Sequence, residues 1–465
     1  MPNKVLSLSL VLAALIAGCA GEETGVTRHI TSVDASAFPS NYARQWMTNL
    51  ENSIKGDVIS PPVAARIYAY GSIAMYEAVV HGMPGYQSMA GQLNGLDSLP
   101  TPHPALEYDW PTVLAQTMHR MMLARVPAFP GAVQRGPYVF PNRIFFEYTT
   151  TSQSPLTTLG PAQIGFRRAA GVSEEVIANS IAFADELAAA LIAWTEADNY
   201  YDVRYRGFVP PVGPDKWVPT GFSDTDKIAI PLEPYFGDVR PLALAISDEC
   251  SPENLGLSPP PFSTDPASAF YAEGLAVHNA ALALTDEQRI VARYWADGPG
   301  DTGTPAGHWV AITSVMLRDK NLAEAARAYA FVSIGFLDSF IAVWQSKYQY
   351  NLLRPTTYIR RHIDADWLPL LPTPQFPTYV SGHSGQSGCS ARLLAQIFGD
   401  GPFTDTTKIR RGFAPRTFAS FDAAADEAAL SRLYGGIHYP MDNNHGLATG
   451  RCVADKVIER VQLEE

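Results

Sequence analysis

Patterns typical of amphipathic helices follow one another almost without interruption through the C-terminal part of the chain. Apolar residues recur there at the spacing of one helix face, and glycines, prolines and polar capping residues separate the patterns. No stretch alternates polar and apolar residues as a half-buried strand does, and no repeat of fixed period is present. The sequence therefore predicts an all-α fold with a C-terminal helical bundle. The helices expected in this bundle cover residues 266–284, 285–296, 305–319, 321–353, 383–398, 424–434 and 440–462.

The N-terminal half contains fewer helical patterns, and they are set further apart. The clearest one begins with Ser173, which is placed as an N-cap and is followed by two glutamates in the first turn. Another begins at a pair of prolines, which are favoured in the first turn of a helix. The helices expected in this half cover residues 61–81, 109–125 and 173–198.

A proline-rich segment, residues 200–261, separates the two groups of helices. Prolines interrupt every candidate element within it. An irregular segment of this length is unusual inside a compact domain, so we expect it to wrap over the helical body or to form a substrate mouth. We call this segment the excursion. The predicted division of the chain is an N-terminal helical region, 40–264, and a C-terminal bundle, 265–465, that carries the chemistry.

The overall composition restricts the class of ligand. The chain has 465 residues, of which 46% are hydrophobic and 17% charged, so it can bury a substantial core. Its formal net charge of -12 argues against a general nucleic-acid binder, because a phosphate backbone needs a basic face. Any site for an anion must therefore be a local cluster of cations.

The N-terminus resembles a bacterial lipoprotein signal. Lys4 precedes an apolar run, 5–16, that is too short to span a bilayer, and small residues stand directly before Cys19. We expect a lipoprotein signal peptide over residues 1–18, lipidation of Cys19 and a polar tether over residues 19–39. An ordinary secretory signal with an incidental cysteine is the alternative. The expected location is the bacterial periplasm, outer membrane or cell surface, with a lipid anchor as the sole membrane contact, because no later segment looks apolar enough to span.

The cysteines allow at most one internal disulfide if Cys19 is lipidated. Cys250, Cys389 and Cys452 then remain, so at least one of them stays free or pairs between chains. A bond between Cys389 and Cys452 is plausible from the sequence.

The first of three charged segments places Lys347 and Arg354 seven residues apart. That spacing returns almost to the same face of a helix, so the two cations are expected to project side by side. Pro355 is expected to end the helix near Arg354 and to leave its guanidinium free to point inward. Taken alone, two such cations more often lie on a solvated surface. The aromatic and apolar residues around them favour a buried site for an anion.

The second segment is Ser381-Gly382-His383, directly before a helix of small residues. A serine hydroxyl and an unobstructed glycine N–H at a helix N-terminus favour a bound anion. His383 is placed there to exchange protons with that anion. The simpler reading is a capping serine beside a surface histidine.

The third segment joins Arg432, His438 and Asp442 across a pair of glycines. The glycines are expected to break the helix after Arg432, so that Arg432 and His438 converge from two elements. Asp442 lies one helical turn after His438 and can accept a hydrogen bond from one ring nitrogen, which leaves the lone pair of the other available. Alone, this histidine–aspartate spacing is a weak signal.

In this order and spacing, the three segments resemble one superfamily. The pattern Lys-x6-Arg-Pro, then Ser-Gly-His, then Ser-Arg-x5-His-x3-Asp is that of vanadium-dependent haloperoxidases, type-2 phosphatidic acid phosphatases and bacterial acid phosphatases. The resemblance covers about residues 265–460 and is complete at the functional positions. The N-terminal half is similar only in general character, as a helical region like that of the larger haloperoxidases.

The resemblance implies a cage that can hold vanadate, or phosphate in the same place. In a haloperoxidase, His438 would be the nitrogen ligand of vanadium, His383 the acid–base group toward hydrogen peroxide, and Lys347 the group that polarises bound peroxide. Halide would then be oxidised to hypohalous acid, for transfer to small organic acceptors, with no change in the oxidation state of vanadium. The residues expected to bind the oxyanion are Lys347, Arg354, Ser381, Gly382, His383, Arg432 and His438.

Two alternatives remain open. In an acid phosphatase, His438 would be the nucleophile, oriented by Asp442, with His383 protonating the leaving group. No cage residue separates these two functions. Trp344 and Phe376 resemble the bulky aromatic residues near the halide site of haloperoxidases, and with the chain length they favour that reading. A non-catalytic oxyanion-binding lipoprotein is less favoured, because binding alone needs no histidine on each side.

Three further expectations concern residues outside the cage. A haem peroxidase is excluded by the lack of Cys-x-x-Cys-His and of an evident haem partner among the other histidines. Asp297 is a candidate partner for an arginine of the cage. The histidines expected to be structural or exposed are His81, His119, His278 and His362.

Overall fold

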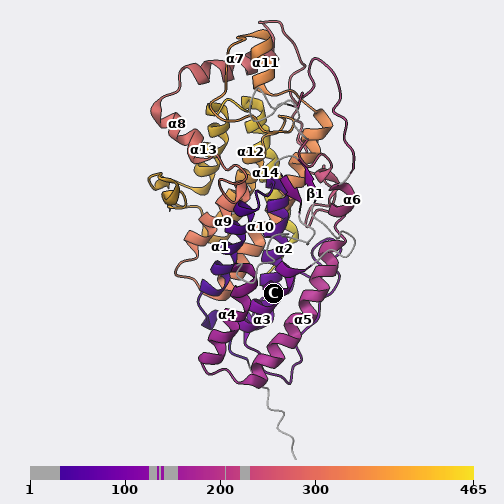
Figure 1. The fold of residues 1–465 in the computed structure, drawn as a ribbon, viewed down its shortest axis with the longest axis vertical. Helices are drawn as coiled ribbons and strands as arrows, with labels where there is room; N and C mark the ends of the chain where they lie inside the picture. Colours follow the sequence, from indigo (N-terminus) through magenta and orange to yellow (C-terminus); the bar gives the residue numbers. More distant parts are fainter. Residues whose placement is uncertain (1–31, 125–132, 136–137, 141–154, 205, 220–230) are drawn as a thin grey trace, which may run out of the picture.

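The computed structural model describes residues 32–124, 133–135, 138–140, 155–204, 206–219 and 231–465. Within them the fold is mostly helical, which confirms the predicted all-α class (Figure 1). Four helices pack on one another in the middle of an elongated molecule. At one end lie α3 (Trp110–Leu123), α4 (Pro155–Ala169) and α5 (Glu174–Glu196), and at the other α7 (Ala269–Leu282), α8 (Asp286–Tyr294) and α11 (Pro355–His362). The four central helices are α2 (Pro61–Val79), α10 (Leu322–Tyr350), α12 (Gly382–Phe398) and α14 (Pro440–Arg460).

All the helices expected from the sequence are present, with ends that differ by a few residues. The remaining expected ones are α9 (Thr304–Met316) and α13 (Phe421–Tyr434). The sequence reading missed α1 (Asn41–Gly56), α4, α6 (Tyr200–Arg204) and α11. Of these, α1 buries Tyr42, Trp46, Leu50 and Ile54 at a helical spacing that the sequence does contain.

Two pairs of short strands, which the sequence reading did not predict, accompany the helices. Two short antiparallel hairpins are present, and the strands of each are three residues long. Such strands are too short for an alternating pattern to stand out from the surrounding sequence. The pairs are β1 (Val133–Arg135) with β2 (Tyr138–Phe140), and β3 (Phe403–Asp405) with β4 (Arg416–Phe418).

The central helix α10 explains why so much apolar sequence occurs in one run. Asn321 and Glu324 form a reciprocal capping box that fixes its start. By length and composition, both α10 and α5 could cross a membrane, so the expectation that no later segment is apolar enough is wrong. The most apolar stretch of α10 is 94% buried inside the fold, whereas that of α5 is 39% buried. The composition of α10 is therefore accounted for by its place in the core.

Glycine allows α12 and α14 to approach closely beside the charged segments. A Cβ atom added to Gly446 of α14 would lie 2.8 Å from the carbonyl oxygen of Ser381 and 2.9 Å from the Cβ of Ser384. A side chain at this position would push α14 away from the N-terminus of α12.

The excursion is irregular apart from α6 and a short 3-10 helix, Phe236–Asp238, within its described residues. It follows the surface of α10, and its backbone is paired with buried partners. The N–H groups of Leu242, Ala243 and Leu244 all donate to the carboxylate of Asp338 on α10, at 2.6 to 2.9 Å. The N–H of Leu232 donates to the carbonyl oxygen of Gln375 at 3.1 Å. The excursion therefore wraps over the helical body, as predicted.

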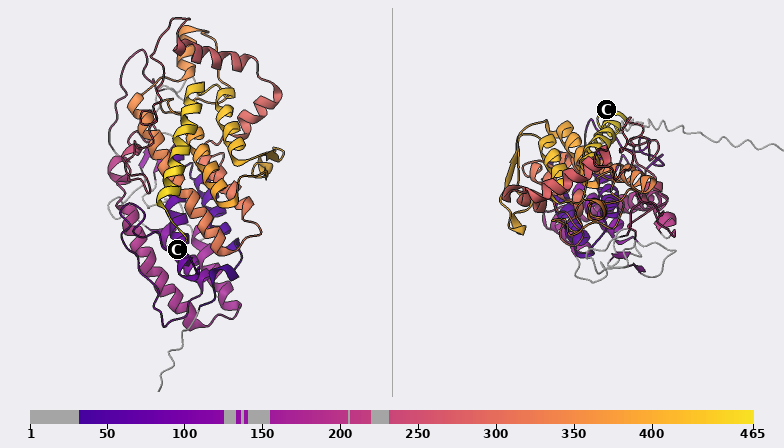
Figure 2. Two further views of the ribbon diagram at one scale, coloured as in Figure 1. Left: turned by 180° about the vertical axis from the view of Figure 1, so that it is seen from behind. Right: turned by 90° about the horizontal axis from the view of Figure 1, so that it is seen from above.

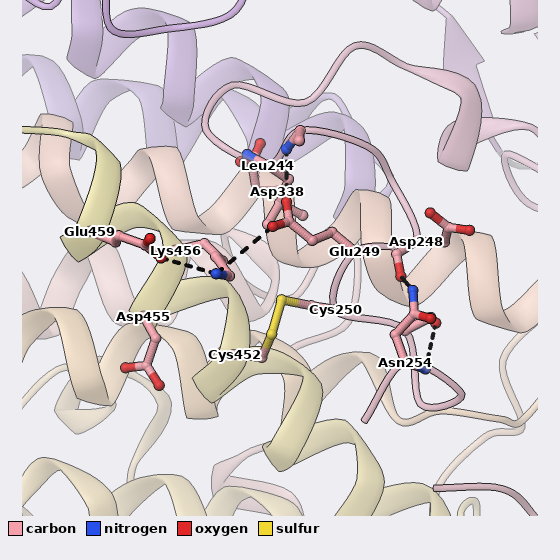
Figure 3. The surroundings of a disulfide bond; sticks show 12 residues. Leu244, Asp248, Glu249, Cys250, Asn254, Asp338, Cys452, Asp455, Lys456 and Glu459 are labelled. Atoms are coloured by element: carbon pink, nitrogen blue, oxygen red, sulfur yellow. Dashed lines mark hydrogen bonds and ion pairs between the residues drawn. A yellow bond between two sulfur atoms is a disulfide. The ribbon is translucent and has the colours of Figure 1, made fainter. Parts of the chain in front are cut away.

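A disulfide fastens the excursion to α14. It joins Cys250 to Cys452, with the Cα atoms 5.7 Å apart, and Lys456 lies beside it between Glu249 and Glu459 (Figure 3). The proposed pairing of Cys389 with Cys452 is wrong. Cys389 is free and buried, because its side chain points from α12 toward Gly335 of α10. The sequence does not reveal which helix face a lone cysteine occupies.

The predicted signal peptide and the lipidated Cys19 lie outside the described residues. The predicted tether reaches residue 39, yet Ala35–Ala37 already forms a 3-10 helix in which Ala35 is buried. The N–H of Leu322 donates to the carbonyl oxygen of Phe38 at the start of α10. The folded body therefore begins before the end of the predicted tether.

Candidate active site

Lys347 and Arg354 converge, but by a different route from the one predicted. α10 ends at Tyr350, and Asn351 follows in the left-handed conformation at φ 51°. Arg354 is the N-cap of α11, so Pro355 begins a helix where the sequence reading expected it to end one. The expected placement of both cations on one helix is therefore wrong.

Backbone carbonyls hold these two cations in place. The Nζ of Lys347 donates to the carbonyl oxygens of Pro377 and Thr378, at 3.1 and 2.9 Å. Arg354 donates through Nε to the carbonyl oxygen of Phe376 at 2.8 Å and through Nη1 to that of Ile437 at 2.9 Å. Its Nη2 is fully buried and has no hydrogen-bond partner in the part of the chain that the structure describes.

The second segment forms a helix N-terminus, as expected. Ser381 is the N-cap of α12, and its Oγ accepts from the N–H and the hydroxyl of Ser384, at 3.3 and 2.9 Å. Its own hydroxyl hydrogen can therefore be donated to a ligand. Gly382 is the first residue of the helix, so its N–H has no acceptor within the helix. The N–H of Ser381 donates to the carbonyl oxygen of Asp442, which ties the second segment to the third.

The third segment turns sharply between two helices. α13 ends at Tyr434, Gly436 has φ 74°, and α14 begins at Pro440, as predicted. The Nδ1 of His438 lies 2.8 Å from Oδ2 of Asp442, and its Nε2 lies 3.1 Å from Nη1 of Arg354. An ionised carboxylate accepts from Nδ1–H, so Nε2 carries the lone pair, which accepts from Arg354 in the free cage and which a ligand in the cage could take over.

Arg432 and His383 complete the cage. Arg432 donates through Nη2 to the carbonyl oxygens of Ala292 and Trp295, at 3.2 and 2.8 Å. Its Nη1 lies 3.4 Å from Nε2 of His383. The structure thus brings all the predicted cage residues to one place. Lys347, Arg354 and Arg432 are buried, and no carboxylate forms an ion pair with any of them among the described residues.

Burial and mutual repulsion disfavour the positive charge of the cage residues. Burial, together with Arg354, holds the pKa of Lys347 well below its ordinary value. Burial and neighbouring cations likewise hold the pKa values of His383 and His438 well below 6.5. Burial also lowers the pKa of Arg354 and Arg432, whose guanidinium groups nevertheless stay charged near neutral pH. An anion among these groups would relieve the repulsion.

Asp297 does not bond to a cage arginine, contrary to expectation. Its carboxylate forms a short ion pair with Lys408, and its Oδ2 lies 2.9 Å from Nδ1 of His308. The Nε2 of His308 lies 2.8 Å from Asp405, so the histidine bridges two carboxylates. Burial and Lys408 lower the pKa of His308, but the two carboxylates outweigh them and raise it. Asp297 is therefore neutralised by its own partners, and it influences Arg432 and His383 only through space.

A cavity of about 400 Å³ opens above the cage. Gly382, His383, Arg432 and His438 form its polar floor. Trp344 and Phe376, the predicted pocket residues, line it and contact each other with ring centroids 5.0 Å apart. The Nε1 of Trp344 donates to the carbonyl oxygen of Leu232, so the excursion forms one wall.

Sequence reasoning missed Thr378, which contacts the predicted residues directly. Its hydroxyl makes a short hydrogen bond with Oδ2 of Asp442 and lies 3.3 Å from Nδ1 of His438. The N–H of Tyr439 donates to the same carboxylate oxygen at 3.1 Å. Thr378 stands three residues before Ser381, but a threonine followed by an aromatic residue carries no recognisable motif.

Known proteins share this fold and this C-terminal region. A crystal structure of a bacterial vanadium-dependent iodoperoxidase matches with a TM-score of 0.79 and 30% identity, covering 92% of this chain and 98% of that one. An apo-type bacterial vanadium-dependent chloroperoxidase has the same fold at a TM-score of 0.59 and 12% identity, over 86% of this chain and 92% of that one. The family model for the VCPO second helical-bundle domain matches residues 327–464.

A curated relative supports the same assignment over a shorter region. The vanadium chloroperoxidase of Curvularia inaequalis is 29% identical over a match that covers 32% of this chain and 35% of that protein. The match thus spans about a third of the relative's length. Together with the fold and the cage, these similarities show that the chain belongs to the vanadium-dependent haloperoxidase family.

Proposed function

We propose that the protein is a vanadium-dependent haloperoxidase, which uses hydrogen peroxide to oxidise a halide to hypohalous acid. The observation that carries this proposal is the group of three buried cations, Lys347, Arg354 and Arg432, without a paired carboxylate in the described structure. Buried charges are costly unless they are paired, so the cage calls for an anion of its own. Membership of the haloperoxidase family makes vanadate the leading candidate.

The cage residues fit a tetrahedral oxyanion. Arg354 offers the unpartnered Nη2, Ser381 a free hydroxyl hydrogen and Gly382 a free N–H. Lys347 and Arg432 would bind the remaining oxygens, and the Nε2 lone pair of His438 would ligate the metal. When bound, vanadate supplies a Lewis acid that activates peroxide without itself being reduced.

His383 is the residue placed to move protons. It lies at the N-terminus of α12 on the cavity floor, beside Arg432. In the free cage its low pKa keeps it neutral, so Nε2 or Nδ1 can accept a proton from hydrogen peroxide. The overall reaction consumes one halide, one hydrogen peroxide and one proton, and it yields one hypohalous acid and one water. Asp442 fixes the tautomer of His438, and Trp344, Phe376 and Leu232 limit the water that reaches the cage.

One purified sample divided between two assays tests the proposal. Vanadate, hydrogen peroxide and iodide, bromide or chloride go into one, and a phosphate monoester goes into the other. We expect vanadate-dependent halide oxidation that phosphate inhibits by competition for the cage. Monoester hydrolysis that vanadate inhibits, without halide oxidation, would instead establish an acid phosphatase with His438 as nucleophile.

The variant His383→Ala separates catalysis from simple binding of an oxyanion. We expect it to retain affinity for tungstate, a tetrahedral anion, while halide oxidation falls by about 10²- to 10⁴-fold, as is typical when a general acid–base group is lost. A wild-type protein that binds tungstate but is inert in both assays would contradict an enzymatic role.

A further inference from the structure

Four charged side chains form a closed group beside the cage. We call this group the buried quartet, and its members are Asp297, His308, Asp405 and Lys408. Each of them is at most 5% exposed. The carboxylate of Asp297 pairs with Lys408 through Oδ1 and with Nδ1 of His308 through Oδ2, and Nε2 of His308 pairs with Asp405. Buried charges are costly unless they are paired, and here every charge has its partner within the quartet.

The charges of the quartet balance. An ionised carboxylate can only accept a hydrogen bond, so both ring nitrogens of His308 must donate, and an imidazole with two N–H groups is positive. The two carboxylates likewise raise the pKa of His308 against the effects of burial and Lys408. Two negative and two positive charges therefore face one another. Glu51, a further carboxyl group nearby, adds little charge, because burial raises its pKa.

Asp297 is the member of the quartet that lies next to the cage. The carbonyl oxygen of Trp295 accepts from Nη2 of Arg432 at 2.8 Å and from the N–H of Asp297 at 2.9 Å, so one carbonyl group joins the two residues. Asp297 also lines the cavity whose floor contains Arg432 and His383. Burial lowers the pKa of Arg432, and Asp297 opposes this effect through space. A carboxylate free to act on Arg432 would compete with a bound oxyanion for its charge.

Lys408 keeps Asp297 from doing so. It stands in the turn between β3 and β4, does not line the cavity, and bonds to no cage residue in the described part of the chain. With Lys408 on one oxygen and His308 on the other, both oxygens of Asp297 face away from Arg432. Nη2 of Arg432 donates instead to neutral backbone carbonyls, which leave its positive charge unbalanced.

We propose that Lys408 is a positioning residue for the oxyanion: it neutralises Asp297 and holds this carboxylate off Arg432, so that the charge of Arg432 remains available in the cage. This inference deepens the proposed function and rests on its oxyanion cage. Lys408 does not touch the anion and acts only through Asp297. Its removal should therefore weaken oxyanion binding only while residue 297 carries a negative charge.

A double-mutant cycle on the full chain tests this dependence, with the Kd for tungstate measured by calorimetry. We expect Lys408→Met to raise the Kd by about tenfold, an ordinary size for groups coupled in one network. Asp297→Asn should bind tungstate at least as tightly as the wild type. In that background Lys408→Met should leave the Kd unchanged, so that Asp297→Asn rescues the lysine variant. Lys456→Met is the matched control, because Lys456 also lies between two carboxylates, Glu249 and Glu459, and its Kd should equal that of the wild type.

Each outcome of the cycle decides the matter. An equal loss of affinity from Lys408→Met in both backgrounds would show that the lysine acts on the anion directly or through the fold, and would overturn the proposal. Weaker binding in Asp297→Asn than in the wild type would overturn it too. If Lys408→Met does not fold, the comparison of Asp297→Asn with the double variant still decides, because the proposal requires one Kd for both.

Failure of this inference is distinct from failure of the proposed function. A wild type that does not bind tungstate would remove the oxyanion cage, and the proposed function with it. A wild type that binds tungstate, in a cycle without coupling between Lys408 and Asp297, would remove only the role of Lys408.

Discussion

Asp442 holds His438 through a single carboxylate oxygen that is shared with Thr378. That oxygen accepts from Nδ1 of His438, from the N–H of Tyr439 and from the Thr378 hydroxyl. The carbonyl oxygen of Thr378 also accepts from Lys347. Thr378 is therefore a positioning residue. It contacts both Asp442, which holds the imidazole of His438, and Lys347 of the cage, and it does not line the cavity itself.

The substitution Thr378→Val removes the hydroxyl but keeps the shape of the side chain. We expect the Kd for vanadate to rise by about tenfold, since outer-shell partners of a ligating histidine typically contribute 10- to 100-fold in affinity. Thr378→Ser is the matched control and should restore most of the affinity, because it retains the hydroxyl. Titration of vanadate against halide oxidation measures both. Equal affinity in the valine variant and the wild type would show that the hydroxyl does not support His438.

His383 should take up a proton when an anion enters the cage. In the free protein, burial and then Arg432 lower its pKa, so the ring is neutral near pH 6.5. A nearby anion favours the charged ring and raises this pKa, so binding consumes protons and affinity must increase as the pH falls. Calorimetry of tungstate binding in buffers of different ionisation enthalpy measures the uptake. It should decrease in His383→Gln, and a wild type with no buffer dependence would contradict the prediction.

For single residues, the sequence predicted those roles that follow from the spacing of residues along one segment. The cage residues stand in a recognisable order, and the pairing of His438 with Asp442 follows from their separation by one helical turn. The role of Thr378 and the partners of Asp297 could not be predicted, because both depend on segments that meet only in the folded chain. His308 and Lys408 are far apart in sequence, yet both bond to Asp297.

At the scale of a single element, the helix α2 is buried on every side. All 19 of its residues are buried, so it lacks the polar face that a surface helix needs. Its charged residues are therefore paired inside the protein. Glu77 accepts hydrogen bonds from the Ser88 hydroxyl and from the N–H of Met89, both at 2.7 Å. Despite these bonds, burial raises the pKa of Glu77 to about 7.

This shift predicts how stability depends on pH. The folded-state pKa lies above the ordinary value, so between about pH 4.5 and 7 the folded protein binds more protons than the unfolded chain. The contribution of Glu77 to the free energy of unfolding is fully present below pH 4.5. This contribution is lost as the pH rises through 7, and the loss amounts to about 3 kcal/mol. Urea unfolding across this range should show the decrease in the wild type. Glu77→Gln should make it shallower, and an equally steep decrease in the variant would assign it to other groups.

Elements were predicted well where local sequence alone defines their ends. The capped starts of α5, α8 and α10 agree closely with the structure, because a capping residue acts within its own turn. The end of α10 was misplaced, because Asn351 ends this helix in a left-handed conformation and the proline begins α11 instead. The disulfide was misassigned for a related reason. Pairing Cys250 with Cys452 depends on where the excursion is fastened, which no local pattern encodes.

At the scale of the whole molecule, the two predicted halves share one core. A single cluster of buried apolar residues extends from Ala35 to Leu463. Within it α2, from the N-terminal half, packs along α10, from the C-terminal half (Figure 1), and both lie in the middle of the elongated body seen from behind in Figure 2. The active-site cavity is also shared, since Val58 and Pro61 line it together with the cage. The chemistry lies in the C-terminal bundle, but the pocket around it requires both halves.

The predicted boundary at residue 265 can be tested by expressing residues 265–465 alone. Without α2 and the excursion, one side of α10 would be exposed to water, together with Leu352 and Leu353 beside the cage. Apolar patches larger than a few hundred Å² are rarely stable in water, so we expect this fragment to aggregate or to unfold without a cooperative transition. Calorimetry and tungstate binding measure the outcome against the full chain. A fragment that melts cooperatively and binds tungstate as the full chain does would show that the bundle is an independent domain and that the shared core is not required for it.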